Sequence, residues 1–209
     1  MLRSNACDLA PAEAGSDLEA RFVLYVEGPS DSYILKTWAG LVSRPLSRRL
    51  AQSAVILGGR RPARALQHFR DLQRDLRERN AGKLRAVCVL DRDGRGEAAA
   101  SDAPEGLDFF TWPRRHIESY LLVPTAIRRS MRMRPRDPRL DGLLDDLPRN
   151  GSEEALRSLD AKRLLAAKSS LARELGRPLS PARIARCMKA ADLHPDVVEL
   201  LDRLRQATR

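Results

Sequence analysis

This sequence of 209 residues has few aromatic residues, only three cysteines and no long apolar run. No stretch approaches the length that a membrane-spanning helix needs, so we expect no membrane segment. Cys7, Cys88 and Cys187 have no CxxC spacing, and no secretory signal is visible, which together favour a reducing, cytoplasmic compartment. The GxxxxGK[ST] motif is also missing, which excludes a P-loop ATPase site within these residues.

Positive charge, by contrast, is abundant. The chain has 38 Lys and Arg against 28 Asp and Glu, for a formal net charge of +10, and only five of its basic residues are Lys. Such an excess either reflects codon usage in a GC-rich genome or serves a phosphate-binding surface, where neutralised phosphates release counterions. With only 4% aromatics, sequence-independent phosphate contacts are favoured over recognition by base stacking.

Short apolar segments alternate with helical patterns along the first half of the chain. The expected strands are 22–26, 54–57, 85–90 and 107–112, and the expected helices between them are 30–41 and 62–80. This alternation predicts an α/β fold with a parallel four-stranded sheet flanked by helices. No strand pattern follows Tyr120, and amphipathic helices are expected at 152–175, 180–191 and 195–206.

The predicted organisation therefore has three parts. Residues 1–20 show no sustained periodicity of apolar residues and are interpreted as a tail or linker. Residues 21–123 are expected to form an α/β domain, and residues 124–209 an all-helical domain.

Two acidic signatures each follow an apolar run. Val-Glu-Gly-Pro-Ser-Asp occupies 26–31, and Asp-Arg-Asp-Gly occupies 91–94. Because chemistry in an open α/β sheet gathers outside the carboxyl ends of the strands, these carboxylates are expected to lie within reach of each other. Such a cluster is costly without cations, which predicts a Mg²⁺ or Mn²⁺ site. The side chains concerned are Glu27, Asp31, Asp91 and Asp93.

A further carboxylate, Glu118, follows the fourth predicted strand in Arg-Arg-His-Ile-Glu-Ser-Tyr-Leu. Glu118 could complete a second metal position, since two ions roughly 4 Å apart clamp both oxygens of a phosphoryl displacement. Each acidic pair is weak evidence alone. Much more specific is their order along the chain: four successive predicted strands are followed by Glu, by Gly-Gly, by Asp-x-Asp and by Glu.

That ordered set resembles the Toprim domain, which topoisomerases, bacterial primases, small RNA-maturation nucleases and the overcoming-lysogenization-defect (OLD) nucleases share. The resemblance covers about a hundred residues and is strongest to the OLD branch, because of the Asp four residues after the Glu and the HIESYL motif. Four motifs carry it: VEGPSD at 26–31, ILGG at 56–59, VLDRDG at 89–94 and RRHIESYL at 114–121.

The resemblance implies a metal-dependent nuclease that cleaves DNA phosphodiester bonds. Two divalent cations, Mg²⁺ or Mn²⁺, would be held by Glu27, Asp31, Asp91, Asp93 and Glu118, and Glu27, Asp91 and Asp93 would also be catalytic. OLD proteins place an ATPase before this domain, so the chain would be either a C-terminal nuclease region or a standalone relative. The expected partners are DNA, that ATPase region, further copies of the chain or a helicase.

The family also steadies the scissile phosphate with a basic residue from its helical portion. Lys162 is the first candidate and Lys168 the second, because lysine is rare in this chain. Either could equally be a solvated surface residue. The six arginines between 128 and 139 either form a solvated loop or contact a nucleic-acid backbone.

Competing interpretations remain open. Glu27 and Asp31 could simply begin a helix, where carboxylates complement the dipole. VLDRDG also resembles the haloacid-dehalogenase-like phosphatases, with Asp91 as nucleophile, Asp93 as acid/base and Thr111 as the second motif, although the expected Lys before the acidic pair at 145–146 is missing. A third possibility is a non-catalytic module that binds a structural metal and nucleic acid.

Overall fold

A four-stranded, all-parallel sheet forms the centre of the computed structural model, which describes residues 21–92, 103–132, 142, 153–176 and 178–209. The strand order is β2-β1-β3-β4. The α/β prediction is confirmed, and each strand lies within one residue of its expected bounds. The strands are β1 (Arg21–Val26), β2 (Ala54–Ile56), β3 (Leu84–Leu90) and β4 (Leu107–Thr111).

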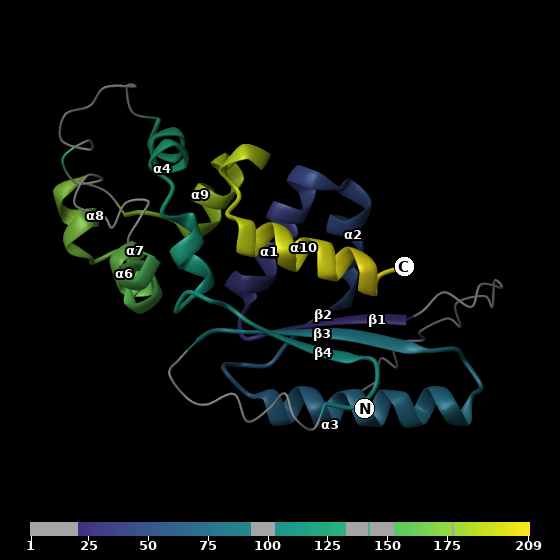
Figure 1. The fold of residues 1–209 in the computed structure, drawn as a ribbon. Helices are drawn as coiled ribbons and strands as arrows, with labels where there is room; N and C mark the ends of the chain where they lie inside the picture. The colour runs from purple at the N-terminus through teal and green to yellow at the C-terminus, as the bar shows by residue number, and fades with distance from the viewer. Residues whose placement is uncertain (1–20, 93–102, 133–141, 143–152, 177) are drawn as a thin grey trace, which may run out of the picture.

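Helices cover both faces of this sheet (Figure 1). One face packs on α3, and α1, α2 and α10 lie over the other. The short helices that follow β4 gather beyond the carboxyl ends of the strands, on the left in Figure 1. The helices are α1 (Pro29–Val42), α2 (Arg44–Ser53), α3 (Pro62–Glu78), η1 (Ile117–Leu121), α4 (Pro124–Met131), α6 (Glu153–Ser158), α7 (Ala161–Leu165), α8 (Ser170–Glu174), α9 (Pro181–Cys187), η2 (Ala190–Asp192) and α10 (Pro195–Ala207).

Several helical segments differ from the sequence prediction. Helix α4 was not predicted, and the helix expected over 180–191 ends at Cys187, where the backbone of Met188 is extended. The continuous helix expected over 152–175 is wrong, since three short helices, α6, α7 and α8, occupy this range. The side chains of Asp160 and Ser169 accept backbone N–H bonds three residues ahead, and each therefore starts a new helix. Helix α2 was not predicted; it begins at the Ser43 cap and buries only two side chains.

The α1-side core contains side chains from both halves of the chain. Leu24 of β1 and Trp38 of α1 belong to the same apolar cluster as Leu200 and Leu204 of α10. The helical extension is thus packed against the sheet, and no strand follows β4 in the described residues.

The predicted domain boundary at residue 123 stays a prediction. Residues 1–20 lie outside the described residues, as do residues 133–140, which include the second half of the arginine-rich stretch. None of the described helices is long and apolar enough to span a bilayer.

Gly106, just before β4, occupies a position that only glycine suits. Its φ is +93°, and a Cβ there would lie 2.5 Å from the carbonyl oxygen of Leu84. We expect Gly106→Ala to lower the free energy of unfolding by about 2 kcal/mol or more, measured by urea unfolding. Gly40→Ala is the control, because its Cβ would meet Ser47 Oγ at an ordinary 3.5 Å. Gly40 is helical, so that variant should gain up to about 1 kcal/mol; equal stability of Gly106→Ala and wild type would contradict the prediction.

Candidate functional site

Four of the five predicted carboxylates meet at the carboxyl-terminal edge of the sheet. Glu27 follows β1, Asp91 follows β3, Asp31 lies in the first turn of α1 and Glu118 lies in η1. Although ionisable, they are only 8, 3, 8 and 5% exposed, respectively. The backbone N–H of Asp91 donates to Glu27 Oε1 at 2.8 Å, which joins the ends of the two central strands directly. The convergence expected from the strand ends is therefore present for these four.

The backbone of Glu27 is held by the Gly-Gly turn that follows β2. The N–H groups of Gly58 and Gly59 both donate to the Glu27 carbonyl oxygen, at 3.0 and 2.9 Å. Two successive donors can point at one acceptor because both glycines have positive φ, +76° and +110°. This contact gives the ILGG motif a physical role: it fixes the peptide that presents the Glu27 side chain.

Asp31 serves the start of α1 as well as the cluster. Its Oδ2 accepts the Gly28 N–H at 2.8 Å, and Pro29 takes the first helical position, where no backbone donor is needed. The simpler interpretation, a carboxylate that caps a helix, is thus observed for Asp31. It does not account for Glu27, whose carboxylate binds the end of β3 instead.

Asp91 is the most connected member of the cluster. Its Oδ1 accepts the Ile117 N–H at 3.2 Å, and its Oδ2 accepts a hydrogen bond from Lys162 Nζ at 2.5 Å. Arg60 Nε donates to the Asp91 backbone carbonyl at 3.1 Å. Asp91 therefore links β3 to the turn that carries Glu118 and to the helical region that carries Lys162.

Burial dominates the electrostatics of this cluster. It raises the pKa of Glu27 to about 7, that of Asp31 to about 6 and that of Glu118 to about 7, and the charge of Asp91 adds to each increase. Oε2 of Glu118 is buried without a hydrogen-bond partner among the described residues. The ionised cluster thus has less positive charge nearby than its carboxylates require.

The donor chemistry of the cluster suits a hard divalent cation. Carboxylate oxygens are the ligands that Mg²⁺ and Mn²⁺ prefer, and the orphaned Glu118 Oε2 is a polar atom that a cation would satisfy. However, no three His, Cys, Asp or Glu side chains of the described residues are arranged to hold one ion. The fifth predicted ligand, Asp93, lies outside the described residues. Asp91, meanwhile, already has a lysine ammonium on its Oδ2 atom.

Of the two candidate lysines, the structure brings only Lys162 to the cluster. Lys168 is exposed between α7 and α8, and its side chain makes no hydrogen bond or ion pair with described residues. Lys162 comes from the second position of α7, far from Asp91 in sequence. The preference for Lys162 over Lys168 is consistent with this placement.

Sequence reasoning missed two contacts of Asp91. Arg60 directly follows the Gly-Gly turn at the same sheet edge, a position that could have indicated it. His116, two residues before Glu118, is buried, with Nδ1 3.5 Å from Asp91 Oδ2 and Nε2 3.7 Å from Asp160 Oδ1. The Asp160 contact depends on how α7 packs, so no local pattern predicts it.

The turn that carries Glu118 is fastened by Arg114 and Tyr120. Arg114 is buried; it donates to the Ser119 carbonyl and pairs with Glu153 at 2.6 Å. The Tyr120 hydroxyl accepts the Arg114 N–H at 3.2 Å and donates to Asp196 at 2.6 Å. These bonds tie η1 to α6 and to the start of α10, so the helical region positions Glu118.

Tyr120→Phe should therefore weaken the fold without changing its shape. The change leaves the buried Arg114 N–H and the Asp196 carboxylate without this partner, which typically costs about 1–3 kcal/mol. Differential scanning calorimetry would measure the loss. Tyr33→Phe is the matched control, because the Tyr33 hydroxyl has no hydrogen bond to described residues and its removal should leave the melting temperature unchanged. Equal melting temperatures for both variants would contradict the role of this hydroxyl.

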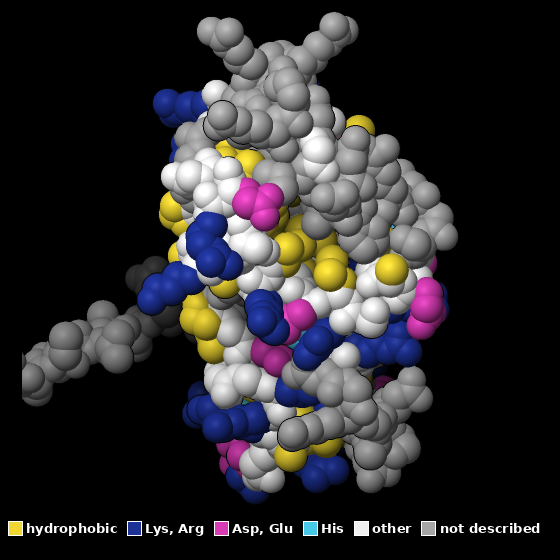
Figure 2. Space-filling view, turned by 90° about the vertical axis from the view of Figure 1, so that its left-hand side faces the viewer, with side chains coloured by type: hydrophobic (Ala, Val, Ile, Leu, Met, Phe, Trp, Pro, Cys, Tyr) yellow, Lys and Arg dark blue, Asp and Glu magenta, His cyan; other side chains and the backbone are white. Residues whose placement is uncertain are grey.

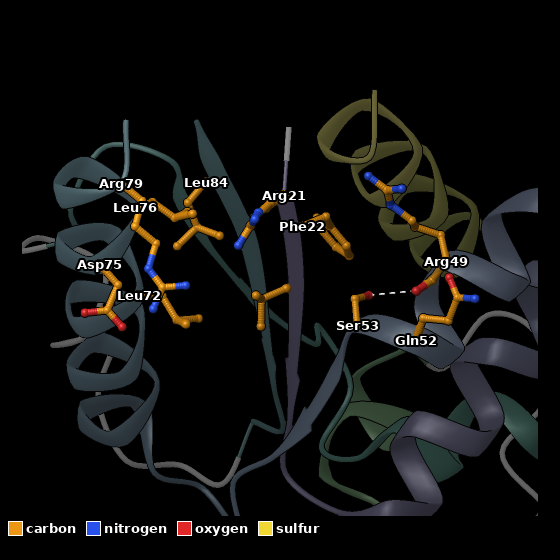
Figure 3. Close-up of a pocket in the computed structure, with 11 residues that line it drawn as sticks. Arg21, Phe22, Arg49, Gln52, Ser53, Leu72, Asp75, Leu76, Arg79 and Leu84 are labelled. Carbon is orange, nitrogen blue, oxygen red and sulfur yellow. Dashed lines mark hydrogen bonds between the residues drawn. The ribbon is translucent and has the colours of Figure 1, made fainter. Parts of the chain in front are cut away.

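A separate pocket of about 490 Å³ lies at the opposite end of the sheet (Figure 3). It forms between α2 and α3 because β2 pairs only with Leu24–Val26, which leaves the first half of β1 without that neighbour. Arg21, Arg49 and Arg79 line it together with apolar side chains. Since a strand rises about 3.3 Å per residue, this pocket is separated from the carboxylates by the length of β1.

Comparisons with family models, curated proteins and solved structures found no match for this chain. The site must therefore be interpreted from its own geometry: four buried carboxylates, one lysine among them, and a Gly-Gly turn at the edge of a parallel sheet.

Proposed function

We propose that this chain is a Toprim-fold nuclease of the OLD type that hydrolyses DNA phosphodiester bonds with two Mg²⁺ or Mn²⁺ ions. The observation that carries the proposal is the convergence of Glu27, Asp91 and Glu118 beside Asp31 at one sheet edge, with a lysine in contact. Buried carboxylates are costly to gather, and a site that binds cations gives that arrangement a purpose.

Each residue has a distinct part in this mechanism. Asp31, Asp91 and Glu118, with Asp93 and Glu27, would hold the ions, which supply an activated water and stabilise charge on the leaving oxygen. Burial raises the pKa of Glu27 to about 7 in the metal-free protein, and a bound ion would favour its ionised form. Lys162, which is half-exposed at the cluster, would steady the non-bridging oxygens of the phosphate.

Basic side chains around the cluster support a nucleic-acid substrate. Figure 2 looks onto the carboxyl ends of the strands, where acidic side chains near the centre of the face lie next to Lys and Arg side chains. Arg60, Arg115 and Lys162 are among the basic residues that contact the cluster or its neighbours. Such a rim favours phosphate contacts that carry no base preference.

Cleavage of supercoiled and linear plasmid, with Mg²⁺, Mn²⁺, Ca²⁺ or EDTA, tests the proposal. We expect nicking and shortening with Mg²⁺ or Mn²⁺ and none with EDTA. Phosphate release from small phosphomonoesters, without plasmid cleavage, would favour the haloacid-dehalogenase-like alternative, in which Asp91 is the nucleophile. DNA binding without either reaction would favour a non-catalytic module.

A further inference from the structure

Lys162 brings an ammonium group to the carboxylate cluster. Its ammonium contacts Asp91 Oδ2 at 2.5 Å, although Asp91 itself is only 3% exposed. The Lys162 side chain is 44% exposed, so its stem reaches the cluster from the solvent side. Helix α7, which carries it, starts at the Asp160 cap and packs on η1 beside Glu118.

The ammonium interacts with the cluster as a whole. Burial alone would lower the pKa of Lys162, but the hydrogen bond and charge of Asp91, with the charges of Glu118 and Asp31, raise it instead. One lysine does not neutralise four carboxylates, since the pKa values of Glu27, Asp31 and Glu118 remain raised. Lys162 therefore provides part of the charge that divalent ions would provide in full.

A divalent ion and this ammonium would compete for Asp91 Oδ2. Mg²⁺ binds carboxylate oxygens at about 2.0–2.1 Å, which would place two mutually repelling cations against one oxygen already contacted at 2.5 Å. We expect the lysine to move away as the ion binds. Its flexible stem and half-exposed position allow this movement toward solvent, the side from which a phosphodiester would approach.

We propose that Lys162 is an internal competitor of the metal: it neutralises Asp91 in the free protein and leaves when a divalent ion binds. The inference rests on the metal site of the proposed function and adds a regulatory property to it. Free protein should bind divalent ions weakly, and a substrate phosphate that draws Lys162 away should strengthen their binding. Metal and substrate would then load together, because coupling between two ligands is reciprocal.

Mn²⁺ binding to the DNA-free protein, measured by electron paramagnetic resonance and calorimetry, tests this inference. Lys162→Met should bind Mn²⁺ about tenfold more tightly than wild type, because the competing cation is gone. Lys162→Arg keeps the charge and should stay near the wild-type affinity. Lys168→Met is the matched control: it removes the same charge from an exposed site nearby and should leave Mn²⁺ affinity unchanged.

The inference is overturned if Lys162→Met binds Mn²⁺ no more tightly than wild type does. It is also overturned if Lys168→Met gains as much Mn²⁺ affinity as Lys162→Met. Thermal unfolding of each variant shows that the comparison is between folded proteins. If wild type cleaves plasmid but Lys162→Met gains no Mn²⁺ affinity, the nuclease proposal is supported and the competition between Lys162 and the metal is refuted. The reverse result, tighter binding without cleavage by wild type, would support the competition and remove the nuclease. Absence of Mn²⁺ binding in every variant would remove both.

Discussion

Asp91→Asn is expected to abolish divalent-ion-dependent DNA cleavage while leaving the protein folded. Asp91 joins Glu27, Ile117 and Lys162, and no other carboxylate of the cluster contacts as many elements in the described residues. Replacing its charge with an amide removes a ligand and the partner of Lys162, so we expect a loss of about three orders of magnitude or more in cleavage rate. Initial rates on supercoiled plasmid with Mn²⁺ would measure it.

The amide is chosen because it preserves the local structure. In the Asp91→Asn variant the side-chain amide oxygen can still accept the Ile117 N–H, and the backbone bond to Glu27 is unaffected. Asp108→Asn is the control: Asp108 lies on the neighbouring strand β4 with an exposed carboxylate that pairs with Arg203, and this change should preserve cleavage. Substantial cleavage by a folded Asp91→Asn protein would refute the proposed site.

Stability in EDTA is expected to fall as the pH rises from about 5 to about 8. The folded protein holds protons on Glu27, Asp31 and Glu118 at pH values where the unfolded chain has released them. Because the folded state binds more protons in this window, its stability decreases with increasing pH and levels off above the raised pKa values. Raising one carboxyl pKa from 4.5 to about 7 alone corresponds to roughly 3 kcal/mol, so the total loss should be at least of that order.

Urea unfolding across this pH range, with EDTA or with Mg²⁺, measures the effect. Mg²⁺ should restore much of the stability at the alkaline end, because it favours the ionised carboxylates. Glu118→Gln removes one of the titrating groups and should give a shallower pH dependence. Glu78→Gln, on the exposed surface of α3, should not. A stability that rises with pH in EDTA would contradict the assigned carboxyl environment.

The sheet could be predicted from sequence because its strands are short apolar runs that end at turn residues. The helical region was harder to predict for physical reasons. The leucines and alanines of 152–175 keep a helical period, but Asp160 and Ser169 offer the backbone side-chain caps that interrupt it. Helix α2 buries only Leu46 and Leu50, and so few apolar positions give a weak periodic signal.

The site was predictable to the extent that backbone topology determines it. Glu27 and Asp91 end neighbouring parallel strands, so their proximity follows from the sheet alone. The partner of Asp91 does not follow from any local pattern, because Lys162 reaches it only through the packing of α7 on η1. The environment of His116 likewise depends on Asp160, which comes from the same helical region.

The contacts of Glu27 have a consequence for how this site tolerates change. Backbone N–H groups hold both ends of the residue: those of Gly58 and Gly59 bind its carbonyl, and that of Asp91 binds its carboxylate. Almost any residue can supply a backbone donor, so this preorganised geometry places few demands on surrounding side chains beyond the two glycines. Widely different sequences can therefore form this geometry, and the similarity between them would be confined to short motifs at the strand ends.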